Sequence, residues 1–176
     1  MLANRRLVIL DLDETLVHVR EGDPKGRCDF TFPGHHAVRR PHIDSFLEFA
    51  FSRFEVAVWS AAAVDYVDHV VQAIIPRPER LGFVWARPRC TLRWEFESAT
   101  TYWLKDLKKV KRKGWALSDV LAIDDKSESY RRNYGNLVRV SPFEGDPADR
   151  QLLDLVEILG RRAQRTDVRE AESAKP

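Results

Sequence analysis

The sequence predicts an α/β fold with a central, mostly parallel sheet, and three observations indicate it. Short apolar runs rich in β-branched residues recur along the 176 residues. Stretches with apolar residues at helical spacing lie between these runs. Two of the runs end directly in acidic residues. Alternating strands and helices are typical of a parallel sheet with crossover helices, and a chain of this length can bury a sizeable core.

Four runs are expected to form buried strands of this sheet. They are apolar without alternation, as in strands that are covered on both faces. They comprise residues 7–10, 55–59, 119–123 and 136–140.

Three helices are expected between and after these strands. The first covers residues 41–54, and Pro41 suits its first position. The second covers residues 61–75 and stops at Pro76. The third begins at Asp146, a capping residue followed by proline. Helical spacing predicts the inward-facing side chains, which are Ile43, Phe46, Leu47 and Ala50, then Val64, Val67, Val71 and Ile74, and finally Leu152, Leu155, Val156 and Leu159.

Two regions interrupt the alternation. Residues 19–40 hold several Gly and Pro around a short strand at 28–32, which predicts a hairpin or flap. Residues 81–97 show partial period-two alternation, which predicts a small antiparallel insertion. Its large apolar residues could line a substrate groove or simply form the core of the insertion. They are Phe83, Val84, Trp85 and Trp94.

Composition restricts the class of protein. Hydrophobic residues make up 44% and charged residues 32%, an ordinary globular balance. No apolar run approaches the roughly 20 residues of a membrane span, and the first run is too short for a signal peptide. Cys28 and Cys90 have no paired spacing, so neither a disulfide framework nor a thiolate metal site is indicated. We therefore expect a cytoplasmic protein with one domain over residues 1–163 and a disordered tail over residues 164–176.

The small net charge of +2 conceals two basic segments, residues 105–113 and 161–165. They could be solvated helix faces, or they could create a positive field that attracts an anionic substrate. A sequence pI of about 8.6 lacks the overall basic footprint of a nucleic-acid-binding domain, so a nucleic-acid partner is possible but disfavoured.

The chemistry is concentrated where two predicted strands end. Asp11 and Asp13 follow the strand at residues 7–10, and open α/β sheets bind ligands at the carboxyl ends of their strands. Two close carboxylates repel each other and favour a bound cation, and Mg²⁺ prefers oxygen ligands. A plain capping or turn role is the alternative for this segment. Asp124 and Asp125 follow another strand, and convergence of both pairs on one metal is the strongest indication of function.

Two further residues are candidate phosphate ligands. Ser60 follows the strand at residues 55–59 and precedes a helix, so its hydroxyl could hold an anion at a helix N-terminus. Lys105 could pair with a phosphate or a carboxylate. Taken alone, Ser60 could be an ordinary helix cap and Lys105 an ordinary surface lysine.

The order of these segments resembles a known family. Residues 11–18, Asp-Leu-Asp-Glu-Thr-Leu-Val-His, are similar to the first motif of haloacid dehalogenase-like (HAD) phosphatases, in the branch of the small C-terminal-domain (FCP1/SCP-like) and Nif-type phosphatases. Residues 40–47 resemble the Arg-Pro helix of that branch. Residues 58–61, 102–107 and 121–130 correspond in order to its later motifs. The resemblance covers residues 7–159 and implies a capless, Rossmann-like three-layer sandwich with a small β insertion.

The resemblance also implies a set of roles. Asp11 would be the nucleophile that forms an aspartyl-phosphate, and Asp13 would be the general acid and base. Mg²⁺ would be held by Asp11, by the backbone carbonyl of Asp13 and by Asp125, with Asp124 nearby. Ser60 and Lys105 would bind the phosphoryl oxygens.

The substrate is less defined than the reaction. An open site suits a phosphoserine or phosphothreonine peptide. A small phosphorylated metabolite and a nucleic-acid end phosphate are alternatives, as is a non-catalytic scaffold that only binds a partner. The acid at Asp13 argues against a scaffold, which would have no use for it.

Overall fold

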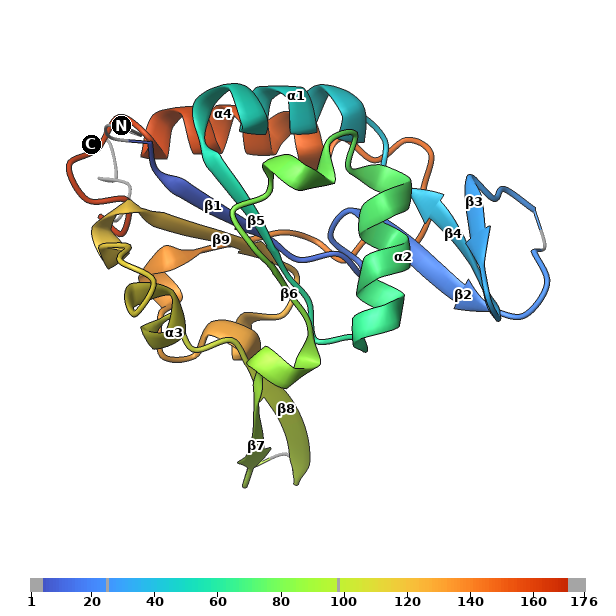
Figure 1. The fold of residues 1–176 in the computed structure, drawn as a ribbon, viewed down its shortest axis with the longest axis horizontal. Coiled ribbons are helices and arrows are strands. Elements are labelled where there is room, and N and C mark those ends of the chain that lie inside the picture. Colours follow the sequence, from blue (N-terminus) through green and yellow to red (C-terminus); the bar gives the residue numbers. More distant parts are fainter. Residues whose placement is uncertain (1–4, 25, 98, 171–176) are drawn as a thin grey trace.

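The computed structural model describes residues 5–24, 26–97 and 99–170, and a parallel five-stranded sheet forms its centre (Figure 1). The strand order is β10-β9-β1-β5-β6, and all neighbouring strands run parallel. This confirms the predicted α/β class. The strands are β1 (Leu7–Leu10), β5 (Glu55–Trp59), β6 (Val84–Trp85), β9 (Val120–Asp124) and β10 (Leu137–Arg139).

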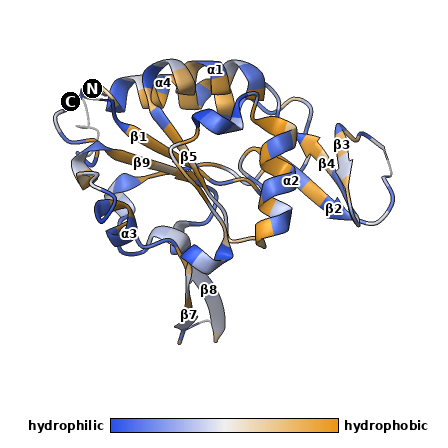
Figure 2. Ribbon diagram, in the orientation of Figure 1, coloured by the Kyte–Doolittle hydropathy of each residue, from blue (hydrophilic) through white to orange (hydrophobic). Residues whose placement is uncertain are grey.

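Both faces of the sheet are covered, which gives three layers. Helices α1 (Ile43–Arg53), α2 (Val64–Ile74) and α4 (Gln151–Arg162) share one core with the side chains of Val8 and Leu10. The opposite face, with Leu7 and Ile9, packs under the short helix α3 (Lys108–Lys111) and irregular segments. Alternate residues of β1 therefore enter different cores, which explains a strand that is apolar throughout. Figure 2 shows that the strands of the central sheet are apolar, whereas the helices that cover it carry both polar and apolar residues.

In the described ranges, five 3₁₀ turns connect these elements. They are η1 (Pro78–Arg80), η2 (Arg87–Arg89), η3 (Leu117–Asp119), η4 (Ser127–Tyr130) and η5 (Tyr134–Asn136).

Two antiparallel units extend from the body in different directions (Figure 1). The predicted flap is a three-stranded sheet of β2 (Val17–Glu21), β4 (His35–Arg39) and β3 (Phe30–Phe32). The second unit is a hairpin of β7 (Thr91–Glu95) and β8 (Thr100–Leu104).

The antiparallel insertion lies further along the chain than its sequence predicts. Residues 84–85 form β6, which pairs in parallel with β5 at the edge of the main sheet. Phe83 and Trp85 stack with ring centres 4.1 Å apart and are buried in the second core. Of the two alternatives left open for these residues, a core role therefore holds for Phe83 and Trp85, in the second core of the molecule and not in a core of the insertion.

All three helices begin later than predicted, and α1 begins at Ile43, so Pro41 precedes the helix. Helix α2 begins at Val64, which is 52% exposed, and Val70 is buried instead. Helix α4 begins at Gln151, because Asp146 accepts a hydrogen bond from the Ala148 N–H at 2.8 Å and so stabilises a turn.

The chain remains packed beyond residue 163. Val168 is fully buried against the first core, and its N–H donates to the Ser118 carbonyl at 3.0 Å. The predicted disordered tail therefore does not begin at residue 164, and the rest of it, residues 171–176, lies outside the described residues. Within the described part of the chain, no helix combines the length and apolarity needed to cross a membrane.

Candidate active site

The first acidic pair lies in the turn that follows β1. The Asp11 N–H donates to the Ile123 carbonyl of β9 at 3.0 Å, so the sheet pairing extends to Asp11 itself. The next turn is tight, with Glu14 in the left-handed region at φ 59°. Asp11 is almost completely buried, whereas Asp13 is half-buried. Both side chains line a pocket at the carboxyl ends of the strands.

Lys105 connects the two acidic pairs. Its Nζ donates to Asp11 Oδ1 and to Asp124 Oδ2, each at 2.6 Å. Burial alone would lower the pKa of Lys105, but Asp11 and Asp124 raise it well above its ordinary value, so the ammonium stays charged. Lys105 is thus separated from the rest of the basic segment, whose other members include the exposed Lys108 and Lys111.

Three carboxylates form a group that fits a metal ion. One oxygen from each of Asp11, Asp124 and Asp125 lies within 4.8 Å of the others. Asp125 Oδ1 is buried and has no hydrogen-bond partner among the described residues, whereas both oxygens of Asp124 have donors. Burial, with Asp11 as the second cause, raises the pKa of Asp125 and of Asp124. An unpartnered buried carboxylate oxygen in an all-oxygen group is the donor set that hard divalent cations prefer.

Ser60 reaches the pocket but does not cap a helix. Its N–H donates to the Trp85 carbonyl at 2.8 Å, and its Oγ accepts a hydrogen bond from the Ala62 N–H at 3.0 Å. The helix begins only at Val64, so both the predicted anion site at a helix N-terminus and the alternative capping role are wrong. Ser60 nonetheless lines the pocket beside Lys105, as its proposed contact with phosphate requires.

Tyr66 was not predicted as a site residue, although its hydroxyl donates to Asp13 Oδ1. Tyr66 lies on α2 and packs edge-on against Phe32 and His35 of the flap. Burial, and secondarily the charge of Asp11, raises the pKa of Asp13 to about 6. A local sequence pattern gives no sign of this contact, because it joins two elements that are distant in the chain.

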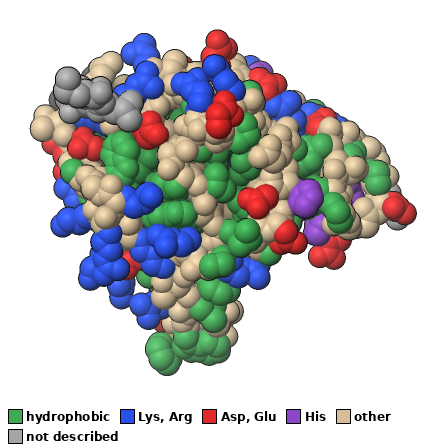
Figure 3. Space-filling model, in the orientation of Figure 1, with side chains coloured by type: hydrophobic (Ala, Val, Ile, Leu, Met, Phe, Trp, Pro, Cys, Tyr) green, Lys and Arg blue, Asp and Glu red, His purple; other side chains and the backbone are tan. Residues whose placement is uncertain are grey.

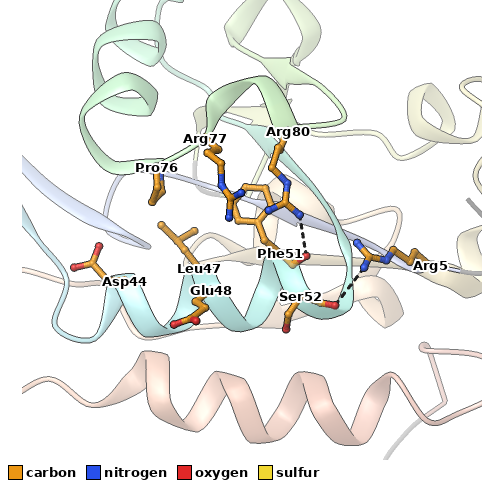
Figure 4. A pocket seen from close by; sticks show the side chains of 9 residues that line it. All are labelled: Arg5, Asp44, Leu47, Glu48, Phe51, Ser52, Pro76, Arg77 and Arg80. Atoms are coloured by element: carbon orange, nitrogen blue, oxygen red, sulfur yellow. Dashed lines mark hydrogen bonds between the residues drawn. The ribbon is translucent and has the colours of Figure 1, made fainter.

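The pocket around these residues has a volume of about 290 Å³. Besides the predicted residues it is lined by Arg87, Trp103, Lys126 and Ser129, which the sequence did not single out. The Arg87 guanidinium lies over the Trp103 ring, 5.6 Å from its centre. A larger cavity of about 500 Å³ lies along α1 (Figure 4), but its lining contains none of the residues predicted to carry chemistry.

Comparison with known proteins identifies the family. The family described as NLI interacting factor-like phosphatase matches residues 6–169. The chain therefore belongs to this family. It is a phosphatase, and so a phosphoric monoester hydrolase.

Relatives and solved structures agree with this membership. The chain is 31% identical to CTD nuclear envelope phosphatase 1B of Danio rerio, over 94% of this chain and 70% of that protein. It is 30% identical to the human CTD small phosphatase-like protein, over 93% of this chain and 58% of that protein. The fold matches that of fission yeast RNA polymerase II CTD phosphatase Fcp1, with a TM-score of 0.59, 19% identity, and coverage of 91% of this chain and 53% of that one.

The relatives correct one expectation. A cytoplasmic location was expected from the absence of a long apolar run, but a relative that aligns with 94% of the chain is named for the nuclear envelope. The expectation of a cytoplasmic location is therefore wrong, because the lack of a long apolar run or of a signal peptide does not show where a folded domain is held.

Proposed function

We propose that this phosphatase uses Mg²⁺ and an aspartyl-phosphate on Asp11 to remove phosphate from phosphoserine or phosphothreonine in polypeptides. The observation that carries the proposal is the convergence of Asp11, Asp124 and Asp125, of which Asp11 and Asp124 also bind the ammonium of Lys105. Their oxygens fit a hard cation, which when bound would neutralise charge on the phosphoryl group. Asp11, Asp125 and the backbone carbonyl of Asp13 would hold it, with Asp124 nearby.

In the first step Asp11 attacks phosphorus. A new bond forms between its carboxylate oxygen and phosphorus while the bond to the serine or threonine oxygen breaks. Asp13 gives its proton to the departing oxygen. Its raised pKa and its position next to Asp11 suit a group that must carry a proton near neutral pH.

In the second step water replaces Asp11 on phosphorus. Asp13 takes the proton from the attacking water, the bond between Asp11 and phosphorus breaks, and inorganic phosphate leaves. Lys105 and Ser60 hold the phosphoryl oxygens throughout, and Lys105 also fixes Asp11 through the 2.6 Å contact.

The proposal of a polypeptide substrate rests on the open surroundings of the site. The described residues form a flap and a hairpin beside the pocket, and none of them builds a separate cap domain over it. The names of the relatives above contain both CTD and phosphatase, which supports a protein substrate here. A metabolite phosphatase would be expected to enclose its substrate more completely.

Hydrolysis of an aryl phosphate by the purified chain, measured across a Mg²⁺ titration, tests the proposal. We expect metal-dependent turnover that Asp11→Asn and Asp13→Asn each reduce by at least about a hundredfold, since each removes a covalent or proton-transfer role. Asp125→Asn should require more Mg²⁺ and should lose the rise in melting temperature that Mg²⁺ gives the wild type.

Circular dichroism and unfolding curves show whether the variants are folded. Metal-independent turnover, or full activity of a folded Asp11→Asn variant, would contradict the proposed mechanism. A folded protein without turnover that still binds Mg²⁺ would favour the scaffold alternative.

A further inference from the structure

The β7–β8 hairpin presents an apolar face to solvent. Leu92 pairs with Trp103 and Trp94 with Thr101 across the two strands, so these four side chains point to the same side. Leu92 and Trp94 are each 52% exposed, and Phe96 in the next turn is 87% exposed. We call the surface of Leu92, Trp94 and Trp103 the hairpin face. Large apolar side chains exposed together mark a binding surface more often than chance.

The other side of the hairpin is already occupied. Glu95 forms an ion pair with Arg131, whose guanidinium lies 5.2 Å from the centre of the Tyr102 ring. Leu104 is buried, and β8 packs against η4. The hairpin is therefore attached to the body through this side and through Trp103, which packs against the second core, whereas Leu92 and Trp94 of the hairpin face remain half exposed.

The hairpin face is continuous with the active-site pocket. Trp103 belongs to both, because it lines the pocket and lies beneath Arg87. Leu92 lies directly across from Trp103, and Trp94 is two residues further along β7, roughly 7 Å at the rise of an extended chain. The face thus begins at the pocket wall and leads outward along the hairpin.

Positive charge surrounds the base of the hairpin. Arg87 and Arg89 precede β7, and the Lys109 Nζ donates to the Arg89 carbonyl at 2.6 Å and to Thr91 Oγ1 at 3.3 Å. Figure 3 shows Lys and Arg side chains gathered next to the apolar tip. This field favours an anionic polypeptide over a neutral or cationic one.

We propose that the hairpin face binds the segment next to the phosphorylated residue of the substrate and selects a large apolar side chain in it. This inference rests on the proposed function. An extended substrate has the same rise per residue as β7, so the selected side chain lies about two to four residues from the phosphorylated one. The contacts to the phosphate support the reaction, and the hairpin face determines which substrates are preferred.

Three phosphoserine peptides of equal length and charge test this inference. One carries Leu three residues before the phosphoserine, one carries Leu three residues after it, and one carries Ser at both places. Each kcat/KM is divided by that for an aryl phosphate, which is too small to reach Trp94. We expect one Leu peptide to exceed the Ser peptide by about tenfold, as for a well-packed apolar anchor.

The double variant Leu92→Ser, Trp94→Ala should lose that preference. Tyr134→Ala is the matched control, since Tyr134 is also an exposed aromatic residue, at 56%, and lies outside the hairpin. Fluorescence anisotropy of the same peptides with the Asp11→Asn variant measures the preference without turnover. A failure of the proposed mechanism is thereby distinguishable from a failure of this inference.

Equal ratios for the three peptides, or a preference that survives in the double variant, would overturn the inference. The hairpin face would then be assigned by two further measurements on the wild type and the double variant. Loss of binding to phosphatidylcholine and phosphatidylserine vesicles would point to a lipid surface. A change in mass by light scattering would point to a second copy of the chain.

Discussion

At the residue scale, the site depends on buried charges that neutralise one another. Lys105 is one of the largest fully buried side chains, and its ammonium contacts two carboxylates. An uncompensated charge at this depth would be strongly destabilising, so each partner requires the other. The oxygen of Asp125 that has no partner among the described residues is the exception, and it leaves the cluster able to accept a further ligand.

Asp13 is held in place by Tyr66, and we expect Tyr66→Phe to lower kcat by about tenfold with little change in KM. The change removes the hydroxyl that fixes the carboxyl of Asp13 but keeps the ring that packs on Phe32 and His35. A hydrogen bond to a carboxylate is worth roughly 1.5–3 kcal/mol, and loss of about 1.4 kcal/mol in the transition state is tenfold.

Tyr130→Phe is the matched control for this prediction. Tyr130 is also buried beside the site, but its hydroxyl has no hydrogen-bond partner among the described residues. Its removal should leave kcat within about twofold of the wild type, because no hydrogen bond is lost. Equal effects of the two substitutions would show that Tyr66 does not position Asp13.

At the scale of elements, Arg40 joins the active-site turn to distant parts of the chain. Its guanidinium binds both oxygens of Asp149 at 2.9 and 2.8 Å and donates to the carbonyls of Thr15 and Ser141, each at 3.0 Å. It also lies over the Phe143 ring. One fully buried side chain thus connects the turn after β1 with the segment between β10 and α4, which keeps the acidic residues in register.

Arg40→Met should lower the free energy of unfolding by about 3 kcal/mol, because it leaves Asp149 and two backbone carbonyls without their donor. Urea unfolding measures this loss. Arg39→Met is the neighbouring control, since Arg39 forms an ion pair with the exposed Asp44 and should contribute less than about 1 kcal/mol. Comparable losses in both variants would contradict the role given to Arg40.

The ion pair between Arg40 and Asp149 predicts that the stability of the fold depends on pH. Burial alone would raise the pKa of Asp149, but the hydrogen bonds from Arg40 lower it below its ordinary value. The folded state therefore releases the proton of Asp149 more readily than the unfolded state, and the stabilisation is complete above the ordinary pKa of about 4. It should disappear as the pH falls from about 4 through the lowered folded pKa. The free energy of unfolding of an Asp149→Asn variant should therefore be lower than that of the wild type at pH 6 and approach the wild-type value near pH 2.

The sequence predicted those elements whose signal is local. The buried strands β1, β5 and β9 are unbroken apolar runs, and both acidic pairs follow such runs directly. It missed β6, because two residues carry no periodicity and form a strand only by pairing with β5. Val64 was expected on the buried face of its helix, because helical spacing predicts which residues share a face but does not show where the helix begins. Tyr66 and Arg87 were missed because only the tertiary fold brings Tyr66 to Asp13 and Arg87 to the pocket wall.

At the scale of the whole molecule, the fold continues past the predicted end of the domain. Val168 is fully buried, so Val168→Ala should lower the free energy of unfolding by roughly 1–2 kcal/mol, the value for two buried methyl groups. Val64→Ala is the same substitution at a position that is 52% exposed, and it should change stability by less than about 0.5 kcal/mol. Equal and small effects would place residues 164–170 outside the cooperative fold.

The whole molecule combines a rigid sheet edge, which holds the chemistry, with two antiparallel units beside it. The sheet brings Asp11 and Asp124 together through β1 and β9, and Lys105 arrives from the end of β8. In the proposed mechanism the reaction therefore depends on the rigid core, while the choice of substrate can vary with the hairpin and the flap.

Mass spectrometry of the enzyme quenched in acid during turnover tests the central claim most directly. With a phosphopeptide or an aryl phosphate in excess, we predict a phosphorylated fragment that contains Asp11, stable in acid and lost at alkaline pH as an acyl phosphate should be. The Asp11→Asn variant should show no such fragment. Phosphate on another residue, or steady turnover with no phosphorylated enzyme and no burst, would contradict the assignment of Asp11 as the nucleophile.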